Sequence, residues 1–291
     1  MHDLPLEDTM PLATRLREGL WAFGFLALLG ALLAPSLIWA QASGREVTVP
    51  YQALLILLAT WICQWLRKKP LSETIGRLGA GWVRQLLAGA LVGAMLMIAP
   101  AALLAISGSI NWTVQAADGA LIFAALMAML AVAVAEELLF RGFLFQRLIG
   151  SIGVWPAQLV VAGLFTLTHL GNPGMEGSTR LIAGINIFAA SLLFGWAYLR
   201  TGRLAMPIGI HWAANVVQGP LLGLGVSGNS TSAILMPELV SRQAWWTGGP
   251  FGLEASIPGL VSLLVVVVLF AATGSKAMSW PKFSKLRGNH A

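Results

Sequence analysis

Two adjacent carboxylates and an arginine interrupt an apolar stretch of the sequence at AVAVAEELLFRGF, residues 131–143. Glu137 and Arg141 stand four residues apart with the acid first, the order in which such a pair is most favourable on a helix, so they can neutralise each other. Glu136 projects about 100° away from Glu137 on the helical wheel. It shares a face with Phe140 and is therefore predicted to have a different partner.

Two further apolar stretches carry imidazoles. In FTLTHL, Phe165 and His169 are four residues apart. In HWAAN, His211 and Asn215 have the same spacing, which places each pair on one helix face. Polar and ionisable side chains are costly within a bilayer and normally face an interior or a water-filled cavity. We therefore expect these side chains and Glu136 to meet around one hydrated cavity.

These residue types are suited to the activation of water. A desolvated carboxylate near an imidazole can act as a general base, which is the role predicted for Glu136. A second imidazole and an amide N–H can stabilise an oxyanion. Two histidines and one carboxylate are also the ligand set of an open zinc site, here Glu136, His169 and His211. Zinc and a metal-free reaction are both compatible with the sequence.

The composition is that of a polytopic membrane protein. The chain has 291 residues, of which 57% are hydrophobic and 10% charged, and its mean hydropathy is +0.77. Soluble domains carry about 25% charged residues. The basic residues lie in short loops between apolar runs, which indicates topology signals and contact with lipid headgroups and predicts no nucleic-acid partner. The single cysteine, Cys63, excludes an internal disulfide and a cysteine-based metal site.

We predict an all-α fold with eight transmembrane helices, because a span needs about 20 mostly apolar residues. The predicted spans are 21–42, 50–66, 84–107, 120–140, 154–170, 181–199, 204–224 and 257–273. The fourth is expected to continue as helix to about Leu148. The longest connection, 225–256, is rich in Gly, Ser and Pro. A short N-terminal segment, 1–20, and a basic tail, 274–291, flank the membrane domain 21–273.

The distribution of Lys and Arg predicts the orientation of these spans. With eight spans, fifteen of these residues fall on the side that holds both termini, and three fall on the other side, namely Arg45, Arg180 and Arg242. Loops with an excess of positive charge stay in the cytoplasm. Both termini are therefore predicted to be cytoplasmic.

Three motifs, in this order, resemble the signatures of a known family. EELLFR matches E-E-x-x-x-R, FTLTH matches F-x-x-x-H, and HWAAN matches H-x-x-x-N. These signatures are those of the type II CAAX prenyl endopeptidases, also called CPBP (Abi) intramembrane proteases. Each motif alone is weak, and the specificity comes from all three lying in order on membrane spans. The resemblance covers about 120–224, and the first three spans and the last carry no family signature.

The resemblance implies a role for each motif residue. Glu136 would activate the attacking water with the assistance of His169. His211 and Asn215 would form the oxyanion site. The other motif residues are expected to support the site: Glu137, Arg141 and Phe165.

The resemblance also implies an intramembrane endopeptidase in the bacterial inner membrane. Its expected partners are a membrane-anchored peptide or protein substrate, cut within the chain or near its C-terminus, and the lipid bilayer. Two alternatives remain open from the residues alone. One is a proton-coupled transporter, in which Glu136 and the histidines relay protons. The other is a non-catalytic scaffold or immunity protein. No cleavage site or oligomeric state is predicted.

Overall fold

The computed structural model describes residues 10–241 and 243–274, and this part of the chain is mostly helical. Each predicted span overlaps a helix. These helices are α1 (Leu12–Ser43), α2 (Val49–Leu66), α4 (Ala80–Ile106), α5 (Gly119–Glu137), α7 (Val154–His169), α8 (Gly177–Thr201), α9 (Ala205–Val216) and α11 (Ile257–Gly274). Shorter segments are α3 (Ser72–Ile75), η1 (Leu138–Gly142), α6 (Phe143–Ile152), η2 (Val217–Leu221), α10 (Ala244–Thr247), η3 (Gly249–Phe251) and η4 (Leu253–Ala255). The predicted basic tail lies outside the described residues from 275 onward.

Five helical segments are long and apolar enough to cross a membrane. They are Leu12–Ser43, Val49–Leu66, Ala80–Ile106, Gly119–Ile152 and Gly177–Thr201. The fourth is a continuous segment of 34 residues formed by α5, η1 and α6, so the helix continues beyond the predicted Leu148. Two further apolar helices, Val154–His169 and Ile257–Phe270, are shorter. Together these helices indicate an integral membrane protein.

A two-stranded antiparallel sheet shows that the all-α prediction was wrong in detail. Strand β1 (Ile110–Val114) pairs with β2 (Leu235–Leu239), and Trp112 lies opposite Pro237. Trp112 Nε1 also donates to the Leu222 carbonyl oxygen at 2.8 Å, which ties the sheet to the residue that follows η2. Strand β1 (INWTV) has residues that favour strands, whereas β2 (LMPEL) has a proline and no β-branched residue. Because the two strands lie far apart in the sequence, no hairpin signal marks them.

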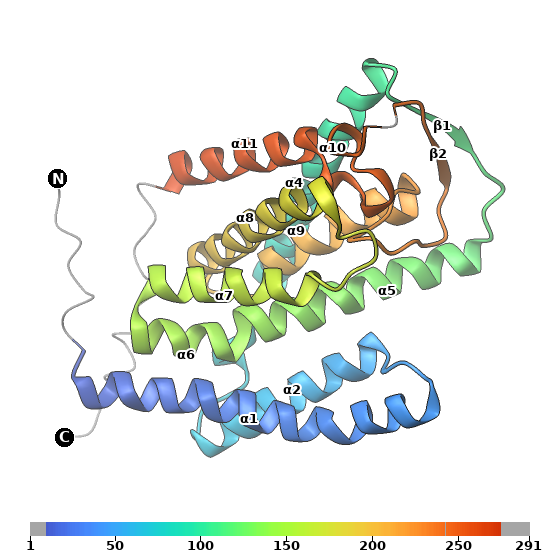
Figure 1. Cartoon of the computed structure of the whole chain (residues 1–291). Coiled ribbons are helices and arrows are strands. Elements are labelled where there is room, and N and C mark those ends of the chain that lie inside the picture. The colour runs from blue at the N-terminus through green and yellow to red at the C-terminus, as the bar shows by residue number, and fades with distance from the viewer. Residues whose placement is uncertain (1–9, 242, 275–291) are drawn as a thin grey trace.

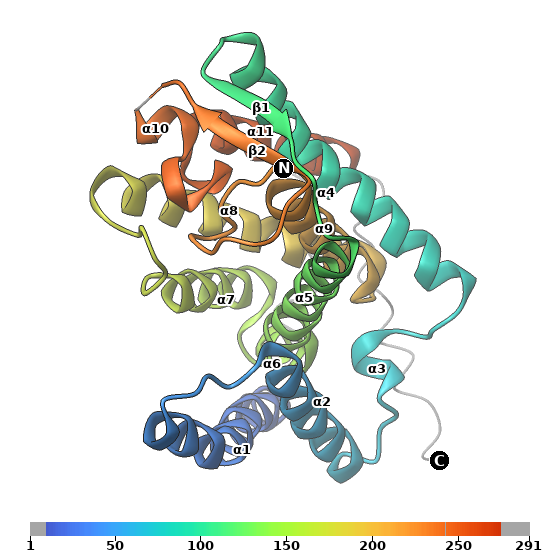
Figure 2. The same ribbon diagram turned by 90° about the vertical axis from the view of Figure 1, so that its right-hand side faces the viewer.

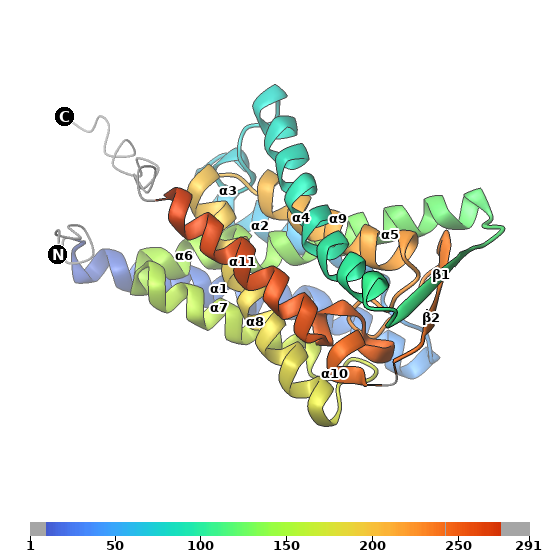
Figure 3. The ribbon, with the colours of Figure 1, turned by 90° about the horizontal axis from the view of Figure 1, so that it is seen from above.

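The helices pack in layers around α5, α8 and α9. In Figure 1 the hairpin of α1 and α2 lies below α5 and α6, and α11 lies on the other side of the bundle, where it contacts α4 and α8. Figure 2 shows α7 and α4 on opposite sides of α5. Figure 3 shows the sheet and α10 at one end of the molecule, away from the start of α1 and the last turns of α11.

Glycines bring the backbones of α4 and α9 into contact. A Cβ atom at Gly93 on α4 would lie 2.0 Å from the Ile210 carbonyl oxygen. A Cβ atom at Gly209 on α9 would lie 2.1 Å from the Leu86 carbonyl oxygen. Only residues without a side chain allow this approach, as in other membrane helix pairs with small residues at the interface. The contact fixes the position of α9 immediately before His211.

Gly93→Ala is therefore expected to lower the stability of the protein. Overpacking of a tight contact costs about 1–3 kcal/mol, because side chains and backbone must shift. The melting temperature in detergent measures the loss. The matched control is Gly30→Ala on α1, where a Cβ atom would have nothing within 4 Å. A Gly93→Ala variant as stable as the Gly30→Ala variant would contradict the close contact.

Ion pairs fasten the first helices to α6. Arg147 on α6 pairs with Glu18 on α1, and it lies 3.7 Å from Glu73 on α3. Arg67, which follows α2, lies 3.4 Å from the same Glu73 carboxylate. Both arginines belong to the fifteen basic residues that the predicted topology places on the cytoplasmic side. In the fold they are largely buried and join α1, α3 and α6 next to η1, which leads into the candidate site.

Candidate active site

The polar residues of the first motif stand at an irregularity in their helix. The α-helix α5 ends at Glu137, and η1 (Leu138–Gly142) continues it as a π-helical turn that contains Arg141. A second π-helical segment, η2 (Val217–Leu221), follows α9 directly after Asn215 and Val216. Single π-helical turns occur frequently at functional sites because they reorient the side chains around them. No pattern in the sequence predicted either segment.

Glu137 joins two of the motifs. Its Oε1 lies 3.2 Å from Arg141 Nη1, and both side chains are fully buried. This contact confirms the predicted i,i+4 pair. The same oxygen lies 2.9 Å from Nδ1 of His211 on α9. With Nδ1 protonated, His211 donates to Glu137, and this bond fixes the orientation of the ring. The contact between His211 and Glu137 was not predicted.

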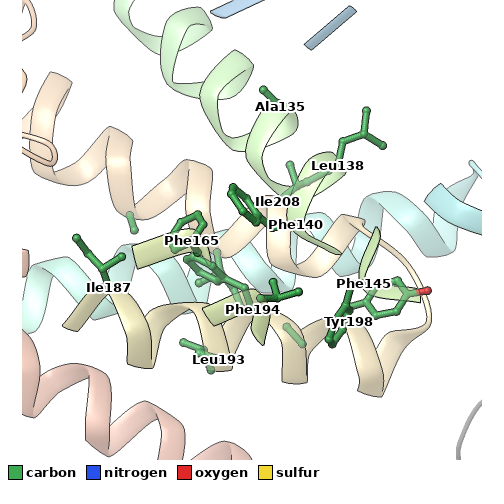
Figure 4. Packing of buried hydrophobic residues seen from close by; sticks show 14 of the residues in the cluster. Ala135, Leu138, Phe140, Phe145, Phe165, Ile187, Leu193, Phe194, Tyr198 and Ile208 are labelled. Carbon is green, nitrogen blue, oxygen red and sulfur yellow. The ribbon is translucent and has the colours of Figure 1, made fainter. Parts of the chain in front are cut away.

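Arg141 is enclosed by aromatic rings and by α8. Two oxygens of Ser191 accept hydrogen bonds from its Nη2: the hydroxyl oxygen at 2.7 Å and the backbone carbonyl oxygen at 3.1 Å. The guanidinium carbon lies 4.8 Å from the centre of the Phe165 ring and 5.1 Å from that of Phe194. A buried cation is tolerated where hydrogen bonds, a carboxylate and ring faces replace water. Figure 4 shows the Phe165 and Phe194 rings close together beside Ile208 of α9.

Phe194 also supports the His211 ring. The two rings are stacked, with centroids 5.0 Å apart and planes at 10°. One ring face is therefore covered by Phe194, while the Nδ1 edge is held by Glu137. These two contacts leave Nε2 as the ring atom that is free to act on a bound molecule.

Glu136 is the carboxylate that Arg141 does not use. Its Oε2 lies 3.7 Å from His211 Nε2, and its side chain is 27% exposed. The same oxygen is buried and has no hydrogen-bond partner among the described residues. Glu136 therefore has a neighbouring imidazole, as the sequence predicted. Its Oε2 could also accept a hydrogen bond from a water molecule or a substrate.

His169 lies farther along the site, at the last residue of α7. Its Nδ1 is 2.7 Å from the Phe165 carbonyl oxygen. The Phe165 ring lies near both imidazoles, with its centroid 4.7 Å from that of His169 and 6.3 Å from that of His211. The structure thus brings Glu136 and His211 together, and Phe165 relates His169 to the same site.

Asn215 follows His211 by one helical turn and is buried. Its carboxamide makes no hydrogen bond within residues 10–241 and 243–274. The N–H groups of this side chain are therefore available to a bound group on the face of α9 that carries His211.

The predicted zinc ligands do not form a metal site. Within the described part of the chain, no three His, Cys, Asp or Glu side chains are grouped so that they could hold a metal ion. Glu136 and His211 are close, but His169 is not part of the same cluster. The donor set present therefore does not fit zinc.

Glu254 is a carboxylate near the site that the sequence reasoning missed. It lies in η4, inside the long connection treated as a loop. Ser227 donates to it through the backbone N–H (2.8 Å) and the hydroxyl (3.1 Å). Burial raises the pKa of the Glu254 carboxyl, while these bonds and the charge of His169 oppose the shift. The available signal was an isolated acid placed directly before the last apolar run.

The protein is thus a helical membrane protein with a buried ionisable site. In this site, two adjacent glutamates of a long apolar helical segment contact a histidine of a second helix. Residues 118–217 match the family described as Rce1-like, the type II CAAX prenyl endopeptidases. This match confirms the resemblance predicted from the three motifs. The match contains all three motifs, whereas Glu254 lies outside it.

A bacterial relative matches a part of the chain. It is the Bacillus subtilis (strain 168) protein named Uncharacterized protein YyaK, which is 36% identical over 84 residues. These residues are 28% of this chain and 27% of that protein. The match thus spans about a quarter of the relative's length.

Proposed function

We propose that the protein is an intramembrane endopeptidase that hydrolyses membrane-anchored peptides with water activated by Glu136. The observation that carries this proposal is that the two adjacent carboxylates differ in their burial and in their contacts. Glu137 is fully buried and occupied by Arg141 and His211. Each carboxylate keeps one oxygen without a hydrogen-bond partner among the described residues, but only the Glu136 side chain is partly exposed, and it faces His211 Nε2. The match of residues 118–217 to a family of endopeptidases supports the same reaction class.

The proposed reaction begins with a water molecule bound to Glu136. The carboxylate accepts a proton from this water, and the oxygen attacks the carbonyl carbon of the peptide bond. Negative charge then develops on the carbonyl oxygen. A proton on His211 Nε2 and the carboxamide of Asn215 are the donors that would stabilise it, because both residues lie on one face of α9. Glu136, assisted by His169, would return the proton to the leaving amine.

The arrangement of the chain in the membrane is part of the proposal. We propose eight spans with both termini in the cytoplasm, in the inner membrane of a bacterium. The five long apolar helices and two shorter ones support this topology, and in Figure 1 the start of α1 and the last described turns of α11 lie on the same side. Cysteine accessibility on each side of the membrane tests the orientation.

Metal chelation is expected to leave the activity within about twofold, because no three ligands from residues 10–241 and 243–274 converge on Glu136 and His211. Purified protein is assayed on a fluorogenic membrane-anchored peptide before and after treatment with EDTA and 1,10-phenanthroline. A zinc add-back after each treatment is the control. Chelator-sensitive hydrolysis that zinc restores would overturn the metal-free reaction.

Hydrolysis by the purified protein separates the proposed function from the two alternatives. The protein is reconstituted in liposomes, where peptide cleavage is followed by mass spectrometry and proton flux by a pH-sensitive dye. Cleavage without flux supports the endopeptidase. Flux without cleavage identifies a transporter, and a stable complex with an uncut partner identifies a scaffold.

A further inference from the structure

The polar face of α9 extends beyond the residues used in the proposed reaction. Gln218 lies in the π-helical segment η2, which continues α9 directly, and it follows Asn215 by three residues and His211 by seven. We call these three side chains the polar stripe. Gln218 is 1% exposed, and its Nε2 donates to the Gly225 carbonyl oxygen at 2.8 Å. Its Oε1 is buried and has no hydrogen-bond partner among the described residues. A buried acceptor without a donor is costly and rare, and it marks a place where a donor is missing.

Glu254 adds a carboxylate at the end of this stripe. It interacts with the Gln218 side chain and with the charge of His169. It makes no ion pair with Lys or Arg in the part of the chain that the structure describes. Ser227 supplies two hydrogen bonds to it, whereas a carboxylate can accept about four. Gln218 and Glu254 together therefore present acceptors, and Glu254 has no Lys or Arg partner among the described residues.

Hydrogen bonds of the backbone around Glu254 fix the position of its carboxylate. Ser227, its hydrogen-bond donor, has a φ of +47°, a left-handed conformation that is uncommon for serine. Asn172, three residues after His169, secures it by donating to the Ser227 carbonyl oxygen at 3.0 Å. The Asn172 N–H in turn donates to the His169 carbonyl oxygen at 3.1 Å. The Glu254 carboxylate and the end of α7 are thus held together by a continuous chain of hydrogen bonds.

The spacing of the stripe relates it to the reacting bond. Seven residues of helix separate His211 from Gln218, which is about 10 Å at 1.5 Å per residue. An extended peptide advances about 3.3 Å per residue. We consider a substrate that runs along α9 with its scissile carbonyl at His211 and Asn215. The substrate residue next to Gln218 is then about three residues from the scissile bond.

We propose that Gln218 and Glu254 form a subsite that binds a lysine or arginine side chain of the substrate about three residues from the scissile bond. The subsite rests on the proposed endopeptidase function, which it extends by a substrate preference. The cation donates to the free Gln218 Oε1 and to the unused lone pairs of Glu254. A cation bound here would favour the ionised form of the buried Glu254 carboxyl, because a nearby opposite charge stabilises a carboxylate.

Binding to a catalytically inactive background tests the subsite without relying on hydrolysis. Fluorescent membrane-anchored peptides carry Lys, Gln or Glu at one place in an otherwise uncharged segment. Their Kd values are measured by anisotropy for Glu136→Gln in detergent. We expect the Lys peptide to bind about tenfold more tightly than the Gln peptide, the size of one hydrogen bond to a charged group. The Glu peptide should bind most weakly.

Three further variants in the Glu136→Gln background identify the residues responsible. Glu254→Gln should abolish the preference for Lys over Gln, and Gln218→Met should reduce it. Glu238→Gln, which changes an exposed carboxylate of β2 without an ion pair, should leave the preference intact. Melting temperatures establish that each variant is folded. If Glu254→Gln does not fold, the lysine preference of Gln218→Met alone tests the subsite.

Equal binding of all three peptides, or a lysine preference that survives both substitutions, would overturn the subsite. Neither result would bear on catalysis. The proposed endopeptidase fails by a separate result, namely the absence of peptide hydrolysis by the reconstituted wild-type protein.

Discussion

Glu136→Gln is expected to abolish peptide hydrolysis while leaving the fold intact. A positioned general base contributes about 10²–10⁴-fold to rate, and glutamine cannot accept the proton of the attacking water. The substitution leaves no buried cation without a partner, because Arg141 pairs with Glu137 and not with Glu136. The expected result is therefore a loss of kcat of about 10³-fold with a melting temperature near that of the wild type. Initial rates with a fluorogenic membrane-anchored peptide and thermal melts in detergent measure the two quantities.

The control for this prediction is Glu46→Gln, which makes the same substitution at an exposed position outside the site. It should retain the wild-type rate and melting temperature. Wild-type hydrolysis by Glu136→Gln would show that another group activates the water. A large fall in its melting temperature would show instead that Glu136 is a structural residue.

The parts of the site that depend on one helix could be predicted from the sequence. Glu137 and Arg141 meet because i,i+4 spacing determines the distance between side chains on a helix, and the structure has them 3.2 Å apart. The same rule separates Glu136 from this pair. His211 and Asn215 share a face for the same reason, and both are buried.

The parts that depend on two helices could not be predicted. The bond between Glu137 and His211 requires α5 and α9 to cross at a particular height, which the contact between the α4 and α9 backbones helps to set. Glycines such as Gly93 on α4 indicate a close helix contact, but nothing in their spacing identifies α9 as the partner. The approach of the Phe165 ring on α7 to His211 likewise depends on how α7 packs, and local spacing carries no information on it.

The connection before the last helix shows a second limit of sequence patterns. Residues 225–256 read as a Gly-, Ser- and Pro-rich loop, and they contain β2, α10, η3 and η4. Their structure follows from close backbone contacts: a Cβ atom at Gly252 would lie 1.9 Å from the Gly225 carbonyl oxygen. Glycines that read as loop residues are thus required for packing, and the packing places Glu254 beside His169 and Gln218.

Glu137→Met is expected to destabilise the protein as well as to inactivate it, in contrast to Glu136→Gln. The substitution removes the carboxylate that neutralises a fully buried guanidinium. Loss of one partner from a buried pair costs about 3–5 kcal/mol, because the other charge stays in a low-dielectric interior. The His211 ring also loses the acceptor of its Nδ1–H and with it a fixed orientation. Thermal melts and hydrolysis rates should both fall, whereas Glu176→Met, at an exposed glutamate, should change neither.

The double variant Glu137→Met/Arg141→Met separates the two roles of the Glu137 carboxylate. Replacement of a complete buried ion pair by apolar side chains of similar size is often neutral or stabilising, so the melting temperature should recover most of the loss. Activity should not recover, because His211 Nδ1 still has no acceptor and the ring is then held only by its stacking on Phe194. A double variant with a recovered melting temperature and no hydrolysis would show that Glu137 contributes to catalysis through its hydrogen bond to His211. Recovery of the hydrolysis rate together with stability would show that the pair serves the fold alone and that Phe194 suffices to orient the imidazole.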